Sequence, residues 1–331
     1  MRLNETEGFS LESRRPLRAK LIFNPVSGKP GESPVQLAEI LTHLQAWEIQ
    51  PEVYMVQPRS RLEMVARDAI QRGMDMIIVS GGDGTVDNVI GALVGQDVIL
   101  GILPTGTQNN TARSLGIPVR DLSKAVALLR RGRKLKVDVG LARCRRVGRW
   151  FLESATVGLL SALYPAADDI QHGDIGKIGD LLATLISSQP AELTLKLDGS
   201  QEEIHTKGHM VMVSNMPTIG AQFQVSPDIS YKDNKLDVFV YANLNKIDLL
   251  GYAVQASTGI PEDPRIQHFR VKSVAIRTDP KMPVMADGVL LGEGPLNASL
   301  RRQAITIMAG PGAQASLIAR SELKPEASGH E

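Results

Sequence analysis

Apolar residues in the first part of the chain alternate between short continuous runs and helical stripes. The runs occupy residues 20–23, 53–56, 76–79 and 98–103. Between them, apolar residues recur at intervals of three and four, which is the spacing of one face of a helix. Continuous apolar runs are typical of strands covered on both faces, and strands that alternate with helices form parallel sheets. The pattern therefore predicts a doubly wound α/β domain over residues 18–134.

The pattern changes after about Lys134, where apolar runs become the main feature. They predict strands at Lys136–Ala142, Trp150–Thr156, His209–Val213, Leu236–Tyr241, Arg270–Arg277 and Ala304–Met308. Helical spacing returns at Ile175–Ile186 and Ile247–Ser257. Many strands with few helices are typical of a sandwich or barrel, so we expect a β-rich, sandwich-like domain over residues 135–302. Residues 1–17 and 313–331 are polar and lack strong periodicity, which is typical of flexible tails.

Composition narrows the class of protein. The chain has 331 residues, enough for two domains at roughly 150 residues each. A single cysteine, Cys144, excludes an intramolecular disulfide framework and favours a reducing cytoplasm. The net charge of +1 argues against capture of nucleic acid by the whole protein. No stretch offers the roughly 18 apolar residues needed to cross a bilayer, so we expect a soluble or peripheral protein.

A glycine-rich loop follows the apolar run at 76–79. Its sequence is Ser80-Gly81-Gly82-Asp83-Gly84-Thr85, and a helical stripe begins directly behind it. Glycines let backbone N–H groups approach a phosphate, and the start of a helix offers unpaired N–H groups to an anion. The loop therefore suits a polyphosphate, although any tight strand-to-helix connection can also need glycine. Asp83 would lie where an anion is expected, which makes sense if it binds ribose, a metal or a reacting hydroxyl.

A second loop supports the same interpretation. The run at 98–103 is followed by Pro104-Thr105-Gly106-Thr107-Gln108-Asn109-Asn110 and then by a short helix that ends at Gly116. Doubly wound sheets bind their ligands at the carboxyl ends of the strands. Two loops of this kind after successive strands therefore predict a nucleotide site.

These loops, in this order, resemble the diacylglycerol kinase catalytic family, which includes sphingosine kinases and bacterial soluble lipid kinases. The motifs that carry the resemblance are FNPVSGK (23–29), SGGDGT (80–85), LPTGTQNN (103–110), VDVG (137–140), KDNKLDV (232–238) and ADG (286–288). The resemblance implies an α/β nucleotide-binding domain, a β-rich lipid-binding domain and ATP in the cleft between them. It also implies that a strand at 303–312 returns to the first domain. The reaction would move the γ-phosphoryl group of ATP to a lipid hydroxyl, with Mg²⁺ required.

The resemblance also assigns roles to residues of this chain. It places catalytic groups at Asp83, Asp138 and Glu293, and a structural magnesium site at Asp233 with the main-chain oxygens of Ser230 and Lys235. The nucleotide site would comprise Asn24, Gly81, Gly82, Asp83, Gly84, Thr85, Thr107 and Asn110. As an alternative, Asp138 and Asp237 lie beside β runs and are also typical of turn or sheet-edge carboxylates.

Three motif carboxylates of the family are missing. Asp87-Asn88 stands where the family has Asn-Glu, Asn110 stands where it has Asp, and Val289 replaces the Glu that serves as general base. In one hypothesis Glu293, four residues beyond Val289, or Asp83 takes over as base and catalysis survives. In another the chain is a catalytically impaired protein that still binds nucleotide or lipid. A third is a soluble-substrate kinase of the NAD kinase type, which shares the GGDGT loop.

Basic residues concentrate near the expected domain junction, at 130–134 and 143–149. They are typical of a solvated helix end and a hairpin tip, or of a surface that attracts anionic headgroups. The amphipathic stretch at 175–186 either packs on a core or borders a lipid cleft. Arginines on both sides of Cys144 could lower the thiol pKa, but no partner His or Asp pattern accompanies it, so we interpret this cysteine as incidental. The expected partners are ATP, a lipid and a membrane surface, and nucleic acid is not expected. The sequence does not indicate the oligomeric state.

Overall fold

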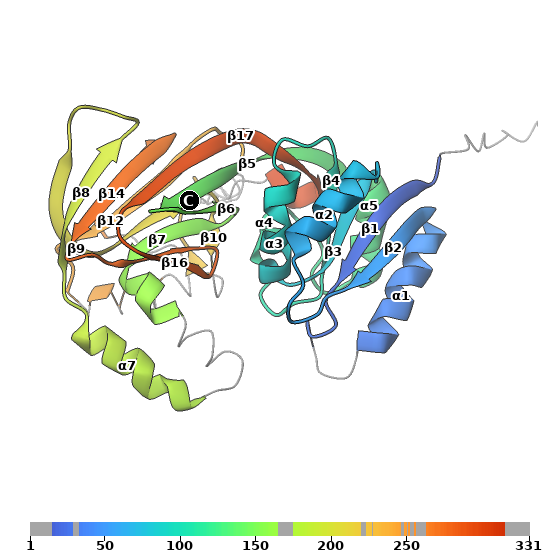
Figure 1. Cartoon of the computed structure of the whole chain (residues 1–331), viewed down its shortest axis with the longest axis horizontal. Coiled ribbons are helices and arrows are strands. Elements are labelled where there is room, and N and C mark those ends of the chain that lie inside the picture. The colour runs from blue at the N-terminus through green and yellow to red at the C-terminus, as the bar shows by residue number, and fades with distance from the viewer. Residues whose placement is uncertain are drawn as a thin grey trace, which may run out of the picture.

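The structure is a computed structural model. It describes residues 15–28, 33–164, 175–219, 223–226, 228–245, 248–249, 251, 255 and 263–314. Most of each expected tail, at 1–14 and 315–331, and most of the helix expected at Ile247–Ser257 lie outside the described residues. The chain forms an α/β half and a β-rich half, as predicted, and Figure 1 shows them side by side.

The α/β half is built on four parallel strands in the order β4-β3-β1-β2. These are β1 (Leu17–Phe23), β2 (Ile49–Met55), β3 (Met76–Gly81) and β4 (Ile99–Pro104). Helices α1 (Ser33–Ala46) and α5 (Leu122–Arg131) pack together, as do α2 (Leu62–Gln71) and α3 (Asp83–Leu93). The apolar runs fill one core because β3 is buried along its whole length. The strand order reverses beside β1, which places the loops after β1, β3 and β4 at one edge.

The β-rich half consists of antiparallel pairs around a second apolar core. Its strands are β5 (Arg133–Cys144), β6 (Val147–Phe151), β7 (Ser154–Gly158), β8 (Ala191–Leu197), β9 (Ile204–Ser214), β10 (Thr218–Ile219), β11 (Phe223–Gln224), β12 (Leu236–Ala242), β13 (Ile266–Val271), β14 (Ser273–Asp279), β15 (Pro283–Ala286), β16 (Val289–Glu293) and β17 (Leu296–Ala309). Short helical elements are α4 (Asn110–Ser114), η1 (Ile175–Lys177), α7 (Ile178–Ser187) and η2 (Pro311–Gln314), and residues 159–164 are also helical.

Two long strands join the halves. β5 and β17 pair antiparallel over most of their length, and they cross from one half to the other in Figure 1. The end of β17 also pairs in parallel with β4, through Thr306 and Ile307. A continuous hydrogen-bonded sheet therefore runs from the β-rich half into the α/β half.

The boundaries of several elements differ from the sequence expectation. The run at Trp150–Thr156 forms two strands, β6 and β7, because Leu152 and Glu153 turn away to donate their N–H groups to Asp287. The run at Arg270–Arg277 is likewise two strands, β13 and β14. The strands β8, β15 and β16 carry no strong apolar run and were not predicted.

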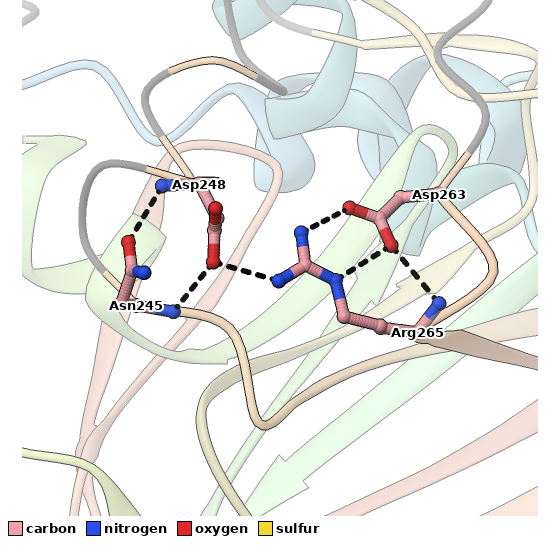
Figure 2. Close-up of polar contacts among 4 residues, drawn as sticks. All are labelled: Asn245, Asp248, Asp263 and Arg265. Carbon is pink, nitrogen blue, oxygen red and sulfur yellow. Dashed lines mark hydrogen bonds and ion pairs between the residues drawn. The ribbon is translucent and has the colours of Figure 1, made fainter.

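A surface ion-pair network fixes the start of β13 (Figure 2). The Arg265 guanidinium donates to Asp248 Oδ2 at 2.8 Å and to both carboxylate oxygens of Asp263, at 3.0 and 2.7 Å. The backbone N–H groups of Asn245 and Asp248 also donate to each other's side chains, at 3.2 and 2.9 Å. Arg265 holds the pKa of both carboxyls below the usual range. The network thus links the chain that leaves β12 to the chain that enters β13.

Candidate functional site

The first glycine loop connects β3 to α3, as predicted. Gly82 caps the helix in an extended conformation, and Gly81 packs so closely on Thr85 that an added Cβ would lie 2.6 Å from its hydroxyl. Thr85 Oγ1 accepts from Asn24 Nδ2 at 3.0 Å, and Asn24 N donates to Ser80 O at 2.9 Å. The residues expected at the nucleotide site on β1 and β3 are therefore in direct contact with one another.

The second glycine loop lies against the first. A Cβ on Gly106 would overlap the backbone of Gly82, so only glycine fits at this contact. Asn109 has a positive φ of 54°, and its side chain accepts from Gly106 N at 3.1 Å and donates to Gly106 O. No side chain fills the space beside Gly84, where an added Cβ would meet nothing within 4 Å. The two loops form a glycine-lined cradle that fits a polyphosphate.

Asp83 links the two loops. Its carboxylate accepts from the backbone N–H of Asn110 at 3.0 Å and of Thr111 at 3.1 Å, at the start of α4. Both oxygens thereby join the two loops, and the catalytic role expected of Asp83 stays a prediction. Asn110 is buried, and Thr107 is exposed on the same loop.

A cavity of about 730 Å³ lies between the two halves of the molecule. The α2 and α3 helices form one wall, and β6 and β16 form the other. Its lining combines polar and apolar side chains, among them Met64, Asp87, Arg149 and Val289. Arg149 Nη2 donates across the cavity to Asn88 Oδ1 at 3.5 Å. The expected interdomain cleft is therefore present, and α3 leads into it from the glycine cradle.

Three carboxyls interact near this cavity, and of these three Asp87 belongs to its lining. Asp87 comes from α3, Glu153 from the turn between β6 and β7, and Asp287 from the turn between β15 and β16. Burial raises the pKa of Asp87 well above its usual value, and the negative charges of Asp287, Glu153 and Asp83 add to that effect. Arg149 opposes it. In the sequence, Asp87 is noticeable only as a departure from the family pattern. No motif around Glu153 predicts a functional role for it.

Asp287 is held by the backbone of the neighbouring turn. Its carboxylate accepts from the N–H groups of Leu152 at 2.6 Å, Glu153 at 3.1 Å and Ser154 at 2.9 Å. Burial raises its pKa to about 6, although these three hydrogen bonds and Arg149 act in the opposite direction. Asp287 therefore fixes the turn that carries Glu153.

Two expected catalytic residues do not reach the cavity. Asp138 is fully buried, and its carboxylate accepts from Asn234 N at 2.8 Å and Gln303 N at 2.6 Å, so it joins β5 to β17. Glu293 is exposed at the far end of β16, four residues or about 13 Å from Val289. Neither residue belongs to the cavity lining, and the catalytic roles expected of Asp138 and Glu293 stay predictions that this geometry does not support.

The expected magnesium site does not fit a metal ion. Asp233 Oδ1 accepts from Lys235 N at 3.0 Å, Oδ2 forms an ion pair with Arg270, and Ser230 O accepts from Asp233 N at 3.4 Å. The Arg270 guanidinium thus already supplies positive charge to the Asp233 carboxylate. Among the described residues, no group of three or more His, Cys, Asp or Glu side chains is arranged to hold a metal.

The structure also places Asp237 and Cys144. Asp237 lies on β12, which pairs on both sides, so it is not at a sheet edge; its carboxylate hydrogen-bonds His268 Nε2 at 2.7 Å. Cys144 is buried, and burial raises the pKa of its thiol despite the positive charge of Arg145. The thiol is therefore not activated.

Comparison with known families and proteins agrees with this geometry. The Diacylglycerol kinase catalytic domain family matches residues 18–142, and the YegS C-terminal NAD kinase beta sandwich-like domain family matches residues 176–309. The chain is 27% identical to the diacylglycerol kinase of Bacillus subtilis (strain 168) over 82% of this chain and 89% of that one. It is 26% identical to the diacylglycerol kinase of Staphylococcus carnosus (strain TM300), over 88% and 94%.

The fold has a similar counterpart among solved structures. A provisionally named diacylglycerol kinase from Bacillus anthracis str. Sterne superposes with a TM-score of 0.73 at 25% identity, over 89% of this chain and 98% of that one. No helix within the described ranges is long and apolar enough to span a membrane. The two matched domains, in the order of the two halves described above, show that the chain resembles the diacylglycerol kinases in both halves, and together with the kinase relatives they support a lipid kinase phosphotransferase.

Proposed function

We propose that this lipid kinase transfers the γ-phosphoryl group of ATP to a hydroxyl of a diacylglycerol-like lipid. The glycine cradle formed by Gly81, Gly82, Gly84 and Gly106 would hold the polyphosphate through backbone N–H groups. Phosphoryl transfer depends mainly on positioning and on neutralising charge, which such a cradle provides. Mg²⁺ would accompany ATP and neutralise the charge that develops on the phosphates.

The exposed apolar side chains of the cavity lining are the observation that favours a lipid substrate. Four large apolar side chains on its lining are between 40% and 59% exposed: Met64, Val147, Val289 and Leu290. Apolar side chains on the rim of a polar cleft suit a substrate with acyl chains and a polar headgroup. A soluble acceptor such as NAD would leave this apolar rim unused. The diacylglycerol kinases among the relatives favour the same class.

We further propose that the tip of the β5–β6 hairpin contacts an anionic membrane surface at the cytoplasmic face. Arg145 and Arg146 are exposed there, beside the exposed Val147 of the cavity rim. The other basic segment has a different use. Arg130 donates to backbone oxygens of Trp47 and Glu48, and Arg131 packs over the Trp47 ring, so both stabilise the end of α5. The hairpin thus places exposed positive charge beside the cavity rim.

The test is phosphorylation by the purified chain with Mg-ATP. Vesicles would carry diacylglycerol, monoacylglycerol, a sphingoid base or phosphatidylglycerol, and NAD would be tested as a soluble acceptor. We expect ATP-dependent phosphorylation of a diacylglycerol-like lipid. Binding of nucleotide without turnover on any acceptor would identify the impaired protein, and turnover on NAD alone would identify the soluble-substrate kinase.

A matched pair of glycine variants checks that activity comes from the cradle. Gly106→Ala forces a Cβ against Gly82, so it should weaken ATP binding and abolish most turnover. Gly179→Ala adds a Cβ on α7 with nothing within 4 Å and should leave the activity unchanged. Equal activity of the two variants would contradict the assigned nucleotide site.

A further inference from the structure

The cavity contains one carboxyl whose buried oxygen has no hydrogen-bond partner. Asp87 is 8% exposed and belongs to the cavity lining. Its Oδ1 is buried without a hydrogen-bond partner among the residues that the structure describes. A buried polar atom without a partner is costly, so native proteins keep such atoms mainly where function requires them. Asp87 is therefore a candidate to meet a group of the substrate.

Asp87 also lies on the correct side of α3. It follows Asp83 by four residues, which places both carboxyls on the same face of the helix, one turn apart. Asp83 faces the second glycine loop, where the phosphates would lie. One turn further along, Asp87 faces the cavity where the lipid hydroxyl would enter. The geometry places Asp87 between the two proposed substrates.

The other carboxyls near the site are engaged elsewhere. Asp83 accepts two backbone N–H groups of α4, and Asp287 accepts three from the turn at 152–154. Glu293 is at the far end of β16, and Val289 carries no proton acceptor. Glu153 is buried beside Asp87 but does not belong to the cavity lining. Glu63 also belongs to the lining, but it is exposed and its Oε1 accepts from Arg67 Nη2 at 2.5 Å. Asp87 is thus the buried acceptor that the cavity offers.

We propose that the Asp87 carboxylate accepts the proton of the lipid hydroxyl, the role that the resembling family gives to a Glu at the position of Val289. This inference rests on the proposed lipid kinase function. The hydroxyl oxygen forms a bond to the γ-phosphorus as the bond between that phosphorus and the bridging oxygen of ADP breaks. The hydroxyl proton moves to Asp87 and then to solvent, and ADP leaves with the bonding electrons.

The charges around Asp87 suit this task. Asp83, Glu153 and Asp287 face it with negative charge, and Arg149 faces it with positive charge. A general base works best when its pKa approaches the working pH, and the raised pKa of Asp87 moves in that direction. Because the base must be ionised, kcat/KM should rise with pH through this raised pKa. The acid limb of the pH profile should therefore lie above the range of an ordinary carboxyl.

The first test is Asp87→Asn, assayed with diacylglycerol vesicles and Mg-ATP. Loss of a general base lowers the rate by about 10²–10⁴-fold, so we expect kcat to fall by that factor while KM for ATP stays similar. The acid limb of the pH profile should disappear. Asp68→Asn, an exposed carboxyl on α2, is the matched control and should keep full activity. A kcat for Asp87→Asn within threefold of the wild type would overturn the inference.

Two further variants separate catalysis from a structural effect. Asp87→Asn/Val289→Glu should regain at least tenfold in kcat, because the carboxylate returns to the family position. Asp87→Ala should regain turnover when formate is added, because a small carboxylate can then occupy the vacated space. Failure of both to regain turnover would assign Asp87 to structure and overturn the proposal.

Stability is an independent readout. The folded pKa of Asp87 lies above its unfolded value, so the folded protein binds the extra proton and loses that stability as pH rises through the folded pKa. Asp87→Asn removes the buried charge and should melt no lower than the wild type at neutral pH, with a shallower decline as pH rises. If Asp87 instead stabilised the fold as a carboxylate, Asp87→Asn would melt lower than the wild type at neutral pH. If the wild-type protein shows no lipid turnover, the proposed function itself is overturned. If the wild type is active and Asp87→Asn is equally active, only this inference is overturned.

Discussion

Asp83 and Asp138 are acidic residues of two motifs, and the structure uses both to hold distant parts of the backbone together. Asp83 binds the start of α4, and Asp138 binds Asn234 and Gln303. The glycines of the cradle were predictable because their requirement is local: a Cβ would collide with the adjacent loop. The hydrogen-bond partners of the two carboxylates were not predictable, because they are 27 to 165 residues away in sequence. The contacts of Asp138 favour the alternative of a structural carboxylate.

Replacing Asp138 with Asn tests this structural position. The amide keeps one acceptor oxygen but turns an NH₂ group toward a backbone N–H that needs an acceptor. Hydrogen bonds to a charged acceptor contribute about 1.5–3 kcal/mol each, so Asp138→Asn should lower the free energy of unfolding by about 3 kcal/mol. Urea denaturation measures this change.

Asp68→Asn serves as the control for Asp138→Asn, because that carboxylate is exposed and ion-paired only with Arg72. It should change the free energy of unfolding by less than about 1 kcal/mol. The two variants should show similar kcat per folded molecule. A large loss of kcat with unchanged stability in Asp138→Asn would restore the catalytic assignment.

At the scale of elements, the strands and helices with local signals were predictable and those shaped by neighbours were not. β3 and α3 have a continuous apolar run and a helical stripe, and both are found where the sequence places them. The break between β6 and β7 depends on Asp287, which is more than 130 residues away in sequence. β15 and β16 have five residues or fewer, and such short strands leave little periodicity to detect.

The β12–β13 pair offers a prediction on metal removal. Asp237 faces Arg270 in the register of these strands, and the guanidinium lies 3.6 Å from Asp237 Oδ1 while it also pairs with Asp233. Because Arg270 already supplies the positive charge, the wild-type melting temperature without ATP should be the same with excess EDTA and with Mg²⁺. Thermal unfolding followed by circular dichroism measures this.

Arg270→Ala should reverse that behaviour. It leaves Asp233 and Asp237 without the guanidinium, so the protein should melt lower in EDTA and recover part of the loss in Mg²⁺. Arg277→Ala removes an exposed arginine of β14 that pairs with Glu203, and it should show no response to Mg²⁺. A wild-type protein that melts lower in EDTA would show that a metal is bound after all.

On the scale of the whole molecule, two cores are joined by β5 and β17, and the site lies where the halves face each other. The division into an α/β half and a β-rich half was predictable from the change in hydrophobic pattern near Lys134. The cavity was not, because it is formed by residues of α2, α3, β6 and β16 that come together only in the folded chain. The exposed hairpin tip lies beside the cavity rim only in the folded chain, so its proposed role was not predictable from the sequence either.

The position of that hairpin leads to the prediction on membrane association. Each basic residue near an anionic surface contributes about 1 kcal/mol, so Arg145→Ala/Arg146→Ala should lose about 2 kcal/mol of membrane binding, or roughly 30-fold in affinity. Cosedimentation with vesicles rich in phosphatidylglycerol measures this, and neutral vesicles should show little binding by either protein. Arg120→Ala/Lys124→Ala removes the same charge at the start of α5 and should weaken binding much less. Equal losses for the two double variants would mean that net charge, rather than the hairpin, attracts the protein to the surface.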